Sequence, residues 1–346
     1  MVTYLHRLIV FLGLACSFLS SQTPYERARP AMRVYGMEQG LPDASVYTLT
    51  LDRTGRLWAG TKEGAAYLKG RAWHTLRMPG GFSSNYVRAI LATRDDSLWF
   101  GTQDGGLWRL NQGNWTHFMA GKELPSNRVN CLTETIDSLG VSTVWVGTNG
   151  GGIATFSKGQ WRSLDTGPLQ TIWRIREMRD PDGKPRMWCA AQEGLARLEA
   201  TQWKMLGPKD GFLGTNVNDV LEVPMPDGRR EIWASCWGLG LARWDGQTWT
   251  MHNASRGFPS PNPTGSLGYT LRADGHPILW AGTYDAGFWW FEDEQWHLLA
   301  QDTSTSILSV LTPEASKPTL WLGTRGSGVA SLDLGGWKSL DDKLGL

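Results

Sequence analysis

A string rich in tryptophan and glycine occurs seven times along this chain of 346 residues, and this repetition limits the fold more than any other feature. One clear copy is LWFGTQDGGLWRLNQGNW, residues 98–115. The first tryptophan of each copy occupies one of seven positions: Trp58, Trp99, Trp145, Trp188, Trp233, Trp280 and Trp321. These positions are 41, 46, 43, 45, 47 and 41 residues apart. Such a period is typical of a four-stranded propeller blade and is too long for most helical repeats.

Each repeat predicts four short strands joined by tight turns. In the second repeat, NYVRAILA is rich in apolar and β-branched residues, which favour a strand. Gly105 and Gly106 follow the next apolar run, and glycine readily adopts the positive φ that tight hairpins need. The four predicted strands of this repeat cover residues 85–92, 98–102, 107–110 and 115–118.

The repeats predict an all-β fold: a single seven-bladed β-propeller of four-stranded antiparallel blades, preceded by a signal peptide. A lone sheet of this kind leaves both apolar faces in water, and stacking the blades around an axis covers those faces. We expect the propeller to span residues 32–340. The predicted repeat units are approximately residues 44–78, 85–120, 127–165, 170–206, 216–253, 265–300 and 304–340.

The N-terminus, MVTYLHRLIVFLGLACSFLSSQ, has the pattern of a secretory signal peptide. Arg7 precedes an apolar run of 12 residues, 8–19, which is too short to span a membrane. We expect residues 1–21 to be cleaved and the mature chain to be periplasmic or secreted, with no membrane span. The sequence leaves open whether the chain is complete or is the N-terminal part of a longer sensor.

Composition and residue patterns argue against several functions. The chain carries 34 Lys and Arg and 33 Asp and Glu residues, for a formal net charge of +1, which gives no basic field for a nucleic acid. Three cysteines follow the predicted signal peptide, Cys131, Cys189 and Cys236, and they are too few and too scattered for a disulfide framework. Because no catalytic, metal-binding or phosphate-binding motif occurs, we predict no catalytic residue, no metal and no cofactor.

Two stretches, LPSNRV at residues 124–129 and DRTGRLWAGT at residues 52–61, resemble the two-component regulator propeller repeat. Seven copies in phase extend the resemblance over roughly residues 33–340, although the copies CAAQEGL and SCWGLGL lose the Gly-Thr pair. The resemblance implies a seven-bladed propeller of the kind found in the periplasmic sensor region of hybrid histidine kinases. It also implies a sensing role, often for carbohydrate fragments.

The positions that vary on this constant frame are the candidate binding residues. Loops that join second to third strands emerge on the same face of a propeller as the loops that join blades, and the residue after each Gly-Thr position lies there. Those residues mix charged, amide and aromatic side chains, as binding surfaces on rigid scaffolds do. Solvated turn residues would give the same pattern, so this alternative stays open. With two residues near the starts of first strands, the predicted ligand-binding set is Lys62, Arg88, Gln103, Asn149, Trp173, Gln192, Trp237, Tyr284 and Arg325.

We predict an exported binding propeller, a sensory or signal-input module with no catalytic activity of its own. Its partner would be an unknown small molecule, such as a carbohydrate, or a protein. One alternative is an enzyme similar to the streptogramin lyases, which needs ionisable side chains and a metal at the axis. Another alternative is a pure protein-interaction scaffold. Four of the six histidines lie on predicted outer strands, which disfavours the enzyme: His74, His117, His252 and His297.

Two segments compete for the outer strand of the last blade, residues 32–35 and residues 337–340. The second segment directly follows the rest of its blade and therefore has the smaller loop-closure cost. We expect this C-terminal strand to complete the seventh blade.

Overall fold

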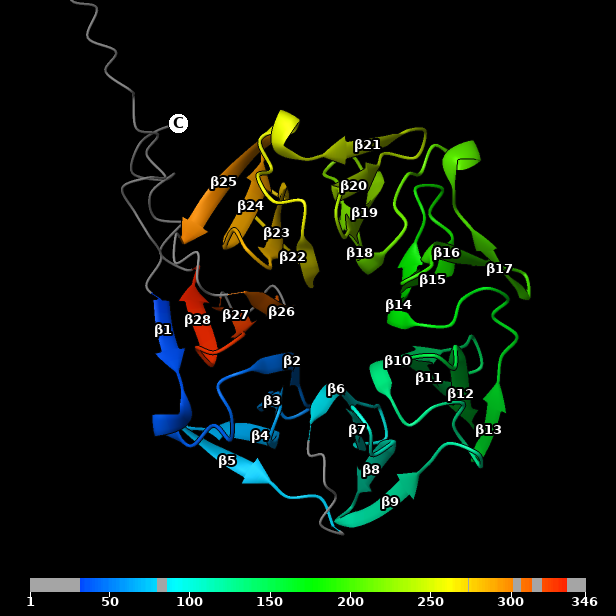
Figure 1. Ribbon diagram of the computed structural model, residues 1–346, viewed down its shortest axis with the longest axis vertical. Helices are drawn as coiled ribbons and strands as arrows, with labels where there is room; N and C mark the ends of the chain where they lie inside the picture. The colour runs from blue at the N-terminus through cyan, green and yellow to red at the C-terminus, as the bar shows by residue number, and fades with distance from the viewer. Residues whose placement is uncertain (1–31, 80–85, 273, 301–305, 313–318, 335–346) are drawn as a thin grey trace, which may run out of the picture.

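The computed structural model describes residues 32–79, 86–272, 274–300, 306–312 and 319–334. These residues form seven four-stranded antiparallel sheets arranged around one axis (Figure 1). The prediction of an all-β, seven-bladed propeller is therefore confirmed. The predicted signal peptide, residues 1–21, lies outside the described residues.

Blades 1 to 3 run outward from the axis in chain order. Blade 1 contains β2 (Val46–Leu51), β3 (Leu57–Thr61), β4 (Gly64–Lys69) and β5 (Ala72–Leu76). Blade 2 contains β6 (Val87–Ala92), β7 (Leu98–Thr102), β8 (Leu107–Asn111) and β9 (Asn114–Phe118). Blade 3 contains β10 (Val129–Ile136), β11 (Ser142–Thr148), β12 (Ile153–Ser157) and β13 (Gln160–Ser163).

Blades 4 to 6 follow the same order. Blade 4 contains β14 (Ile172–Arg179), β15 (Pro185–Ala191), β16 (Gly194–Glu199) and β17 (Gln202–Met205). Blade 5 contains β18 (Val217–Pro224), β19 (Arg230–Cys236), β20 (Gly240–Trp244) and β21 (Trp249–His252). Blade 6 contains β22 (Pro263–Leu271), β23 (Pro277–Thr283), β24 (Phe288–Glu292) and β25 (Gln295–Ala300). In the described connections between blades lie three short 3-10 helices: η2 (Met37–Gln39), η3 (Pro208–Asp210) and η4 (Ala254–Arg256).

Blade 7 joins the two ends of the chain. It contains β26 (Ile307–Leu311), β27 (Thr319–Thr324) and β28 (Val329–Asp333), and its outer strand is β1 (Met32–Tyr35). The expectation that residues 337–340 would fill this place is therefore wrong, because β27 and β1 occupy both edges of β28. Those residues lie outside the described part of the chain.

A physical reason for this closure lies in what β1 holds together. Tyr35 pairs with Val329 across the β1–β28 ladder, and its ring lies 5.8 Å from that of Trp321. Leu41, shortly after β1, is buried in a cluster that also contains Val46 of blade 1 and Val329 of blade 7. Loop-closure cost grows only slowly with loop length, so it is a weak preference. The contacts that join the first and last blades outweigh it.

Glycine in the Gly-Thr position lets neighbouring blades approach closely. A Cβ on Gly101 of β7 would lie 2.5 Å from Cγ1 of Val129, on the first strand of blade 3. A Cβ on Gly282 of β23 would lie 2.8 Å from Cβ of Ile307, on the first strand of blade 7. Carbon atoms pack best at about 3.5–4.0 Å, so a larger residue would push these blades apart.

The first tryptophan of each repeat packs between blades, and in several blades its indole also binds the first hairpin of its own blade. The Trp188 indole N–H donates to Asp180 Oδ1 at 2.7 Å, and that of Trp58 donates to Asp52 Oδ2 at 2.9 Å. The packing is uneven around the ring, because Trp145 is only half-buried. Five of these tryptophans are no more than 3 % exposed: Trp58, Trp99, Trp188, Trp233 and Trp280.

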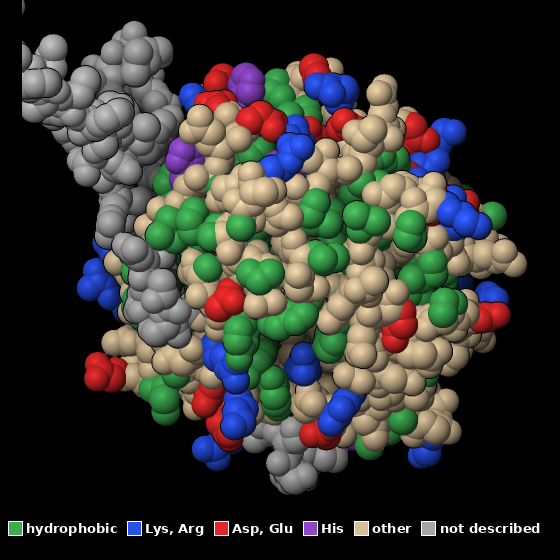
Figure 2. Space-filling view, turned by 45° about the horizontal axis from the view of Figure 1, so that its top comes forward, with side chains coloured by type: hydrophobic (Ala, Val, Ile, Leu, Met, Phe, Trp, Pro, Cys, Tyr) green, Lys and Arg blue, Asp and Glu red, His purple; other side chains and the backbone are tan. Residues whose placement is uncertain are grey.

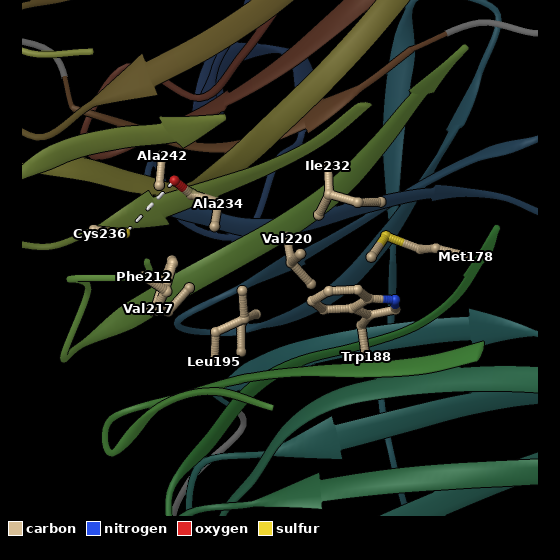
Figure 3. Close-up of a cluster of buried hydrophobic side chains, with 11 residues drawn as sticks. Met178, Trp188, Leu195, Phe212, Val217, Val220, Ile232, Ala234, Cys236 and Ala242 are labelled. Carbon is tan, nitrogen blue, oxygen red and sulfur yellow. Dashed lines mark hydrogen bonds between the residues drawn. The ribbon is translucent and has the colours of Figure 1, made fainter. Parts of the chain in front are cut away.

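Hydrophobic cores lie between consecutive blades rather than at the axis. Figure 3 shows one of them, in which Trp188 of blade 4 packs with Val220 and Ile232 of blade 5. Cys236 belongs to this cluster, whereas Cys189 belongs to the cluster between blades 3 and 4. Cys131, Cys189 and Cys236 are all free and buried, so the interpretation of these cysteines as core residues is confirmed.

Candidate functional site

Residues after the Gly-Thr position occupy equivalent places around one end of the ring, and we call them the turn ring: Lys62, Gln103, Asn149, Gln192, Trp237, Tyr284 and Arg325. The backbone explains the equivalence. The N–H of Gln103 donates to the carbonyl of Tyr86, just before the first strand of its blade, at 2.9 Å. Trp237 makes the same bond at 2.8 Å to the carbonyl of Asn216. The bond recurs in blades 2 to 7 and anchors each turn beside the start of an innermost strand.

A second set of residues lies at the same end of the ring, near the start of each innermost strand. The pairing of each of these strands with the second strand of its blade shifts register there. In blades 1 to 5 and 7 the shift adds one residue, and a β-bulge of this kind re-aims the side chain of the added residue. In blade 6 the shift is longer and spans Thr264–Ser266. We call the added residues the bulge ring: Tyr47, Arg88, Asn130, Trp173, Asn218 and Leu308. The turn ring, the bulge ring and Tyr86 together form the mouth.

Two residues of the bulge ring bind the neighbouring blade. Asn130 Nδ2 donates to the Ile172 carbonyl of the next blade at 3.0 Å. Asn218 Nδ2 donates to the Pro263 carbonyl of the next blade at 3.1 Å. These amides therefore have a structural role, and the functional candidates are the aromatic and cationic members of the ring.

The first group of candidates is an aromatic and cationic cluster centred on Arg88. The Arg88 guanidinium carbon lies 5.6 Å from the Tyr86 ring centroid and 5.9 Å from that of Trp173, within the range of a cation–π contact. Arg88 Nη1 also donates to Gln103 Oε1 at 2.6 Å. Tyr47 extends the cluster, because its ring centroid lies 4.5 Å from that of Tyr86. Residues from blades 1, 2 and 4 are thus in contact. Asn130, a smaller residue, occupies the bulge position of the intervening blade 3.

The second group is centred on Tyr284, on blades 5 to 7. The Trp237 and Tyr284 rings meet edge to face, with centroids 5.7 Å apart. Arg325 donates from Nη1 to the Tyr284 hydroxyl, and its guanidinium carbon lies 5.4 Å from the Tyr284 ring centroid. Trp237 is 38 % exposed and Tyr284 42 % exposed, although both are large and apolar.

Tyr86 lies within electrostatic reach of both groups. Burial raises the pKa of its phenol and a hydrogen bond with Tyr47 adds to the rise, while the charges of Arg88 and Arg325 oppose it. The phenol is therefore neutral at physiological pH and can donate a hydrogen bond. Tyr47 and Tyr86 were not among the sequence candidates, and their position beside the start of an innermost strand was the available signal.

The structure brings together six of the nine sequence candidates and leaves three apart. Arg88, Gln103 and Trp173 form one contact group, and Trp237, Tyr284 and Arg325 form the other. Within the described part of the chain, the side chains of the remaining three make no hydrogen bond: Lys62, Asn149 and Gln192. Their predicted role in binding is not tested by this arrangement.

A buried ion cluster lies on the innermost strands of blades 4 and 5 and was missed in the sequence. Asp219 is fully buried, and it accepts from Arg174 Nε at 3.1 Å and from Arg176 Nη2 at 3.3 Å. The backbone N–H groups of Val220 and Leu267 also donate to this carboxylate, at 2.9 and 3.2 Å. The only sign of this cluster in the sequence was the string TIWRIREM, residues 171–178, in which charged residues alternate with apolar ones.

The ion cluster is poorly suited to proton transfer. Burial alone would raise the pKa of Asp219, but the charges of Arg174 and Arg176 outweigh it and hold the pKa below its ordinary value. A carboxylate with a lowered pKa and four donors is a poor general base at neutral pH. Arg174 Nη2 additionally donates to the Gly265 carbonyl of blade 6 at 3.0 Å, so this one side chain ties three blades together.

The repeats themselves match a known family. Residues 40–63 and 81–108 match the family model described as "Two component regulator propeller". The chain carries two-component regulator propeller repeats. This agrees with the resemblance of DRTGRLWAGT, which overlaps the first match, and with the geometry of the Gly-Thr turns. A comparison with curated proteins found no match.

Solved structures share the fold of this propeller. The extracellular domain of the hybrid two-component system BT3049 from B. thetaiotaomicron is similar with a TM-score of 0.68 and 19% identity, over 88% of this chain and 42% of that one. The extracellular domain of BT4673 from the same organism gives 0.67 and 19%, over 88% and 40%. YCF48 bound to a D1 peptide gives 0.62 and 12%, over 88% and 95%. The chain therefore spans less than half the length of the two B. thetaiotaomicron domains.

Two further properties of the propeller bear on its chemistry. Among its described residues, no group of three or more His, Cys, Asp or Glu side chains is arranged to hold a metal ion. In the same residues, no helix has the length and apolar character needed to cross a membrane.

His252 is a buried histidine between blades 5 and 6. It is 3 % exposed, and its ring centroid lies 4.9 Å from that of Trp233 and 5.1 Å from that of Phe291. The Trp296 indole N–H donates to His252 Nδ1 at 3.3 Å, which places the imidazole proton on Nε2. Burial, assisted by the positive charge of Arg243, lowers the pKa of His252 to about 4.

The propeller should therefore lose stability as the pH falls from 7 to 5. The unfolded chain binds a proton at His252 near pH 6.5 and the folded chain only near pH 4, so acid favours the unfolded state within this window. We expect the free energy of unfolding in urea to be about 2 kcal/mol lower at pH 5 than at pH 7 from this group. His252→Gln should remove this dependence, whereas His276→Gln, at an exposed hairpin, should retain it. A pH dependence unchanged by His252→Gln would contradict this assignment.

Proposed function

We propose that this propeller is an exported recognition module that binds its ligand at the mouth and serves as the input of a signalling system. The observation that carries the proposal is the exposure of Trp237 and Tyr284, which contact each other but belong to no buried cluster. Tyr284 also contacts Arg325. Large apolar side chains held rigidly at a surface are the usual anchors of binding sites. Figure 2 shows hydrophobic side chains beside Lys and Arg side chains across the middle of the face that it presents.

The chemistry of the mouth supports a ligand with flat apolar faces and hydrogen-bond acceptors. The aromatic rings of Trp173, Trp237 and Tyr284 offer stacking surfaces, and aromatic side chains lose little rotamer entropy on binding. Arg88 and Arg325 supply charge-assisted hydrogen bonds that fix orientation. A small molecule such as a carbohydrate, or an extended segment of a protein, has these features.

We propose that the module has no catalytic activity of its own. The ionisable cluster nearest the axis is closed on itself, because Asp219 accepts from two arginines and two backbone N–H groups. The extracellular location of the B. thetaiotaomicron domains supports a periplasmic or secreted protein. Those domains are more than twice as long as their matched part, so a signal from this propeller would pass to another segment or a partner.

Ligand binding should depend on the mouth and not on the frame. Thermal-shift screening with oligosaccharides and with peptides would identify a ligand, and calorimetry would then measure its affinity. We expect Trp237→Ala to weaken binding by about thirtyfold, equivalent to about 2 kcal/mol, because truncating an anchor removes packed apolar area. The melting temperature of the variant should match that of the wild type.

The control is Leu139→Ala, which removes an 86 % exposed apolar side chain from the first hairpin of blade 3, outside the mouth. It should leave both affinity and melting temperature unchanged. Full affinity after separate replacement of Trp173, Trp237 and Tyr284 would overturn the mouth as the binding site. Turnover of any ligand on incubation would overturn the proposed lack of catalysis.

A further inference from the structure

One arginine recurs beside the buried tryptophan of several blades, at the end of the blades away from the mouth. Arg109 pairs with Trp99, Arg197 with Trp188, and Arg243 with Trp233, each across the second and third strands. Each guanidinium carbon lies over its tryptophan, at 5.1, 5.6 and 5.5 Å from the ring centroid. The repeat therefore presents the same cationic group in chemically comparable surroundings, and the copies can be compared directly.

Between blades 5 and 6 this arginine is fully paired. Arg243 donates from Nε and Nη2 to Glu231, at 2.9 and 2.6 Å. Its remaining Nη1 donates to both carboxylate oxygens of Glu294, at 2.6 and 2.9 Å. Glu294 comes from the third hairpin turn of blade 6, where it has a φ of 59°. A non-glycine residue rarely adopts this conformation, so the ion pair is held at a conformational cost.

Between blades 2 and 3 the same arrangement lacks its second carboxylate. Arg109 donates from Nε to Ser97 Oγ at 3.0 Å and from Nη2 to Asp95 Oδ2 at 2.6 Å. The turn that corresponds to Asp293 and Glu294 is Lys158 and Gly159, because both pairs close two-residue hairpins between third and fourth strands. Gly159 thus stands where Glu294 would. Among the described residues, Arg109 Nη1 has no acceptor.

A pocket of about 260 Å³ lies beside Arg109 and Gly159, where the second carboxylate is missing. Trp99, Val144 and Phe156 give it apolar walls, while Arg109 and Lys158 contribute two positive charges. Asp95 is the acidic residue of the lining, so the pocket carries an excess of one positive charge. Blades 2 and 3 are adjacent in the ring (Figure 1). The first and third hairpins lie at the end of a four-stranded blade opposite to the turn ring, so this pocket is separate from the mouth.

We propose that the pocket between blades 2 and 3 binds the carboxylate of a small organic acid, which takes the place that Glu294 occupies beside Arg243. The Nη1 group of Arg109 donates to the carboxylate, Lys158 adds charge, and the apolar body of the ligand lies against Phe156 and Val144. The volume is slightly below the range of about 300–1,000 Å³ for drug-sized ligands, which favours a small molecule. Arginine suits this role because its planar fork matches carboxylate geometry.

The test uses benzoate as the probe and benzamide as its uncharged counterpart. Titrations followed by NMR should show benzoate shifting the Trp99 indole N–H and the Arg109 Nε–H signals, with benzamide binding at least tenfold more weakly. Gly159→Glu should abolish benzoate binding, because it supplies in the same chain the carboxylate that Glu294 supplies to Arg243. The matched control is Gly113→Glu, in the corresponding turn of blade 2, where an added Cβ meets nothing within 4 Å. This variant should bind benzoate like the wild type.

Three outcomes would overturn the proposal. Equal binding of benzamide would show that charge is not recognised, and full benzoate binding by Gly159→Glu would place the ligand elsewhere. Binding of a short glutamate-containing peptide without any binding of benzoate would assign the pocket to an acidic side chain of a protein. Circular dichroism of each variant at the titration temperature would show whether loss of binding reflects loss of fold.

Discussion

Trp188→Ala is expected to lower the free energy of unfolding by about 3–5 kcal/mol. The side chain is fully buried between blades 4 and 5, where it contacts Val220 and Ile232 (Figure 3). Truncation would leave a cavity in that interface and would also remove the indole donor from Asp180, which is 1 % exposed. Urea unfolding at constant pH measures this loss.

The matched control is Trp237→Ala, which makes the same chemical change at a 38 % exposed position. Surface substitutions away from structural features usually change stability by less than about 0.5 kcal/mol. Equal losses at the two positions would mean that the repeated tryptophan is not the structural anchor of its blade. A large loss at Trp188 alone would support the division between frame and mouth.

Asp219→Ala is expected to cost about 3 kcal/mol of stability, because it leaves Arg174 and Arg176 without their buried counterion. The loss should be toward the lower end of the range for buried pairs, since the two arginine side chains remain about one third exposed. Asp219→Asn should cost less, because it keeps an acceptor for the arginines and for the Val220 N–H.

The control for this prediction is Asp227→Ala, which breaks an exposed ion pair with Arg229. Exposed pairs contribute about 0–1 kcal/mol, so we expect a small loss there. If Asp219→Ala destabilised the protein no more than Asp227→Ala, the ion cluster around Asp219 would make no net contribution to stability. Both measurements are made at pH 7, where the lowered pKa of Asp219 keeps its carboxylate ionised.

The candidate site was only partly accessible from the sequence. The repeat places equivalent residues at equivalent turns, so the members of the turn ring could be named from their distance to the Gly-Thr position. Which residues of the mouth touch each other could not be predicted, because contacts such as that between Arg88 and Trp173 join blades that are not neighbours in the chain. Tyr86 was missed because it lies outside the repeated string, and the pocket beside Arg109 was missed because it depends on a residue of the next blade.

The sequence by itself determined the architecture, because each repeat is a local unit whose strands and turns follow from its own pattern. The spacing of the tryptophans predicted seven blades, and the pattern within each repeat predicted four strands. Tertiary structure alone decided how the ring closes, since β1 pairs with β28 from the other end of the chain. Only the tertiary structure showed which charged side chains meet at Asp219 and which side chains of the mouth contact each other. These features depend on which side chains of different blades face each other, and a pattern within one repeat carries no information about that.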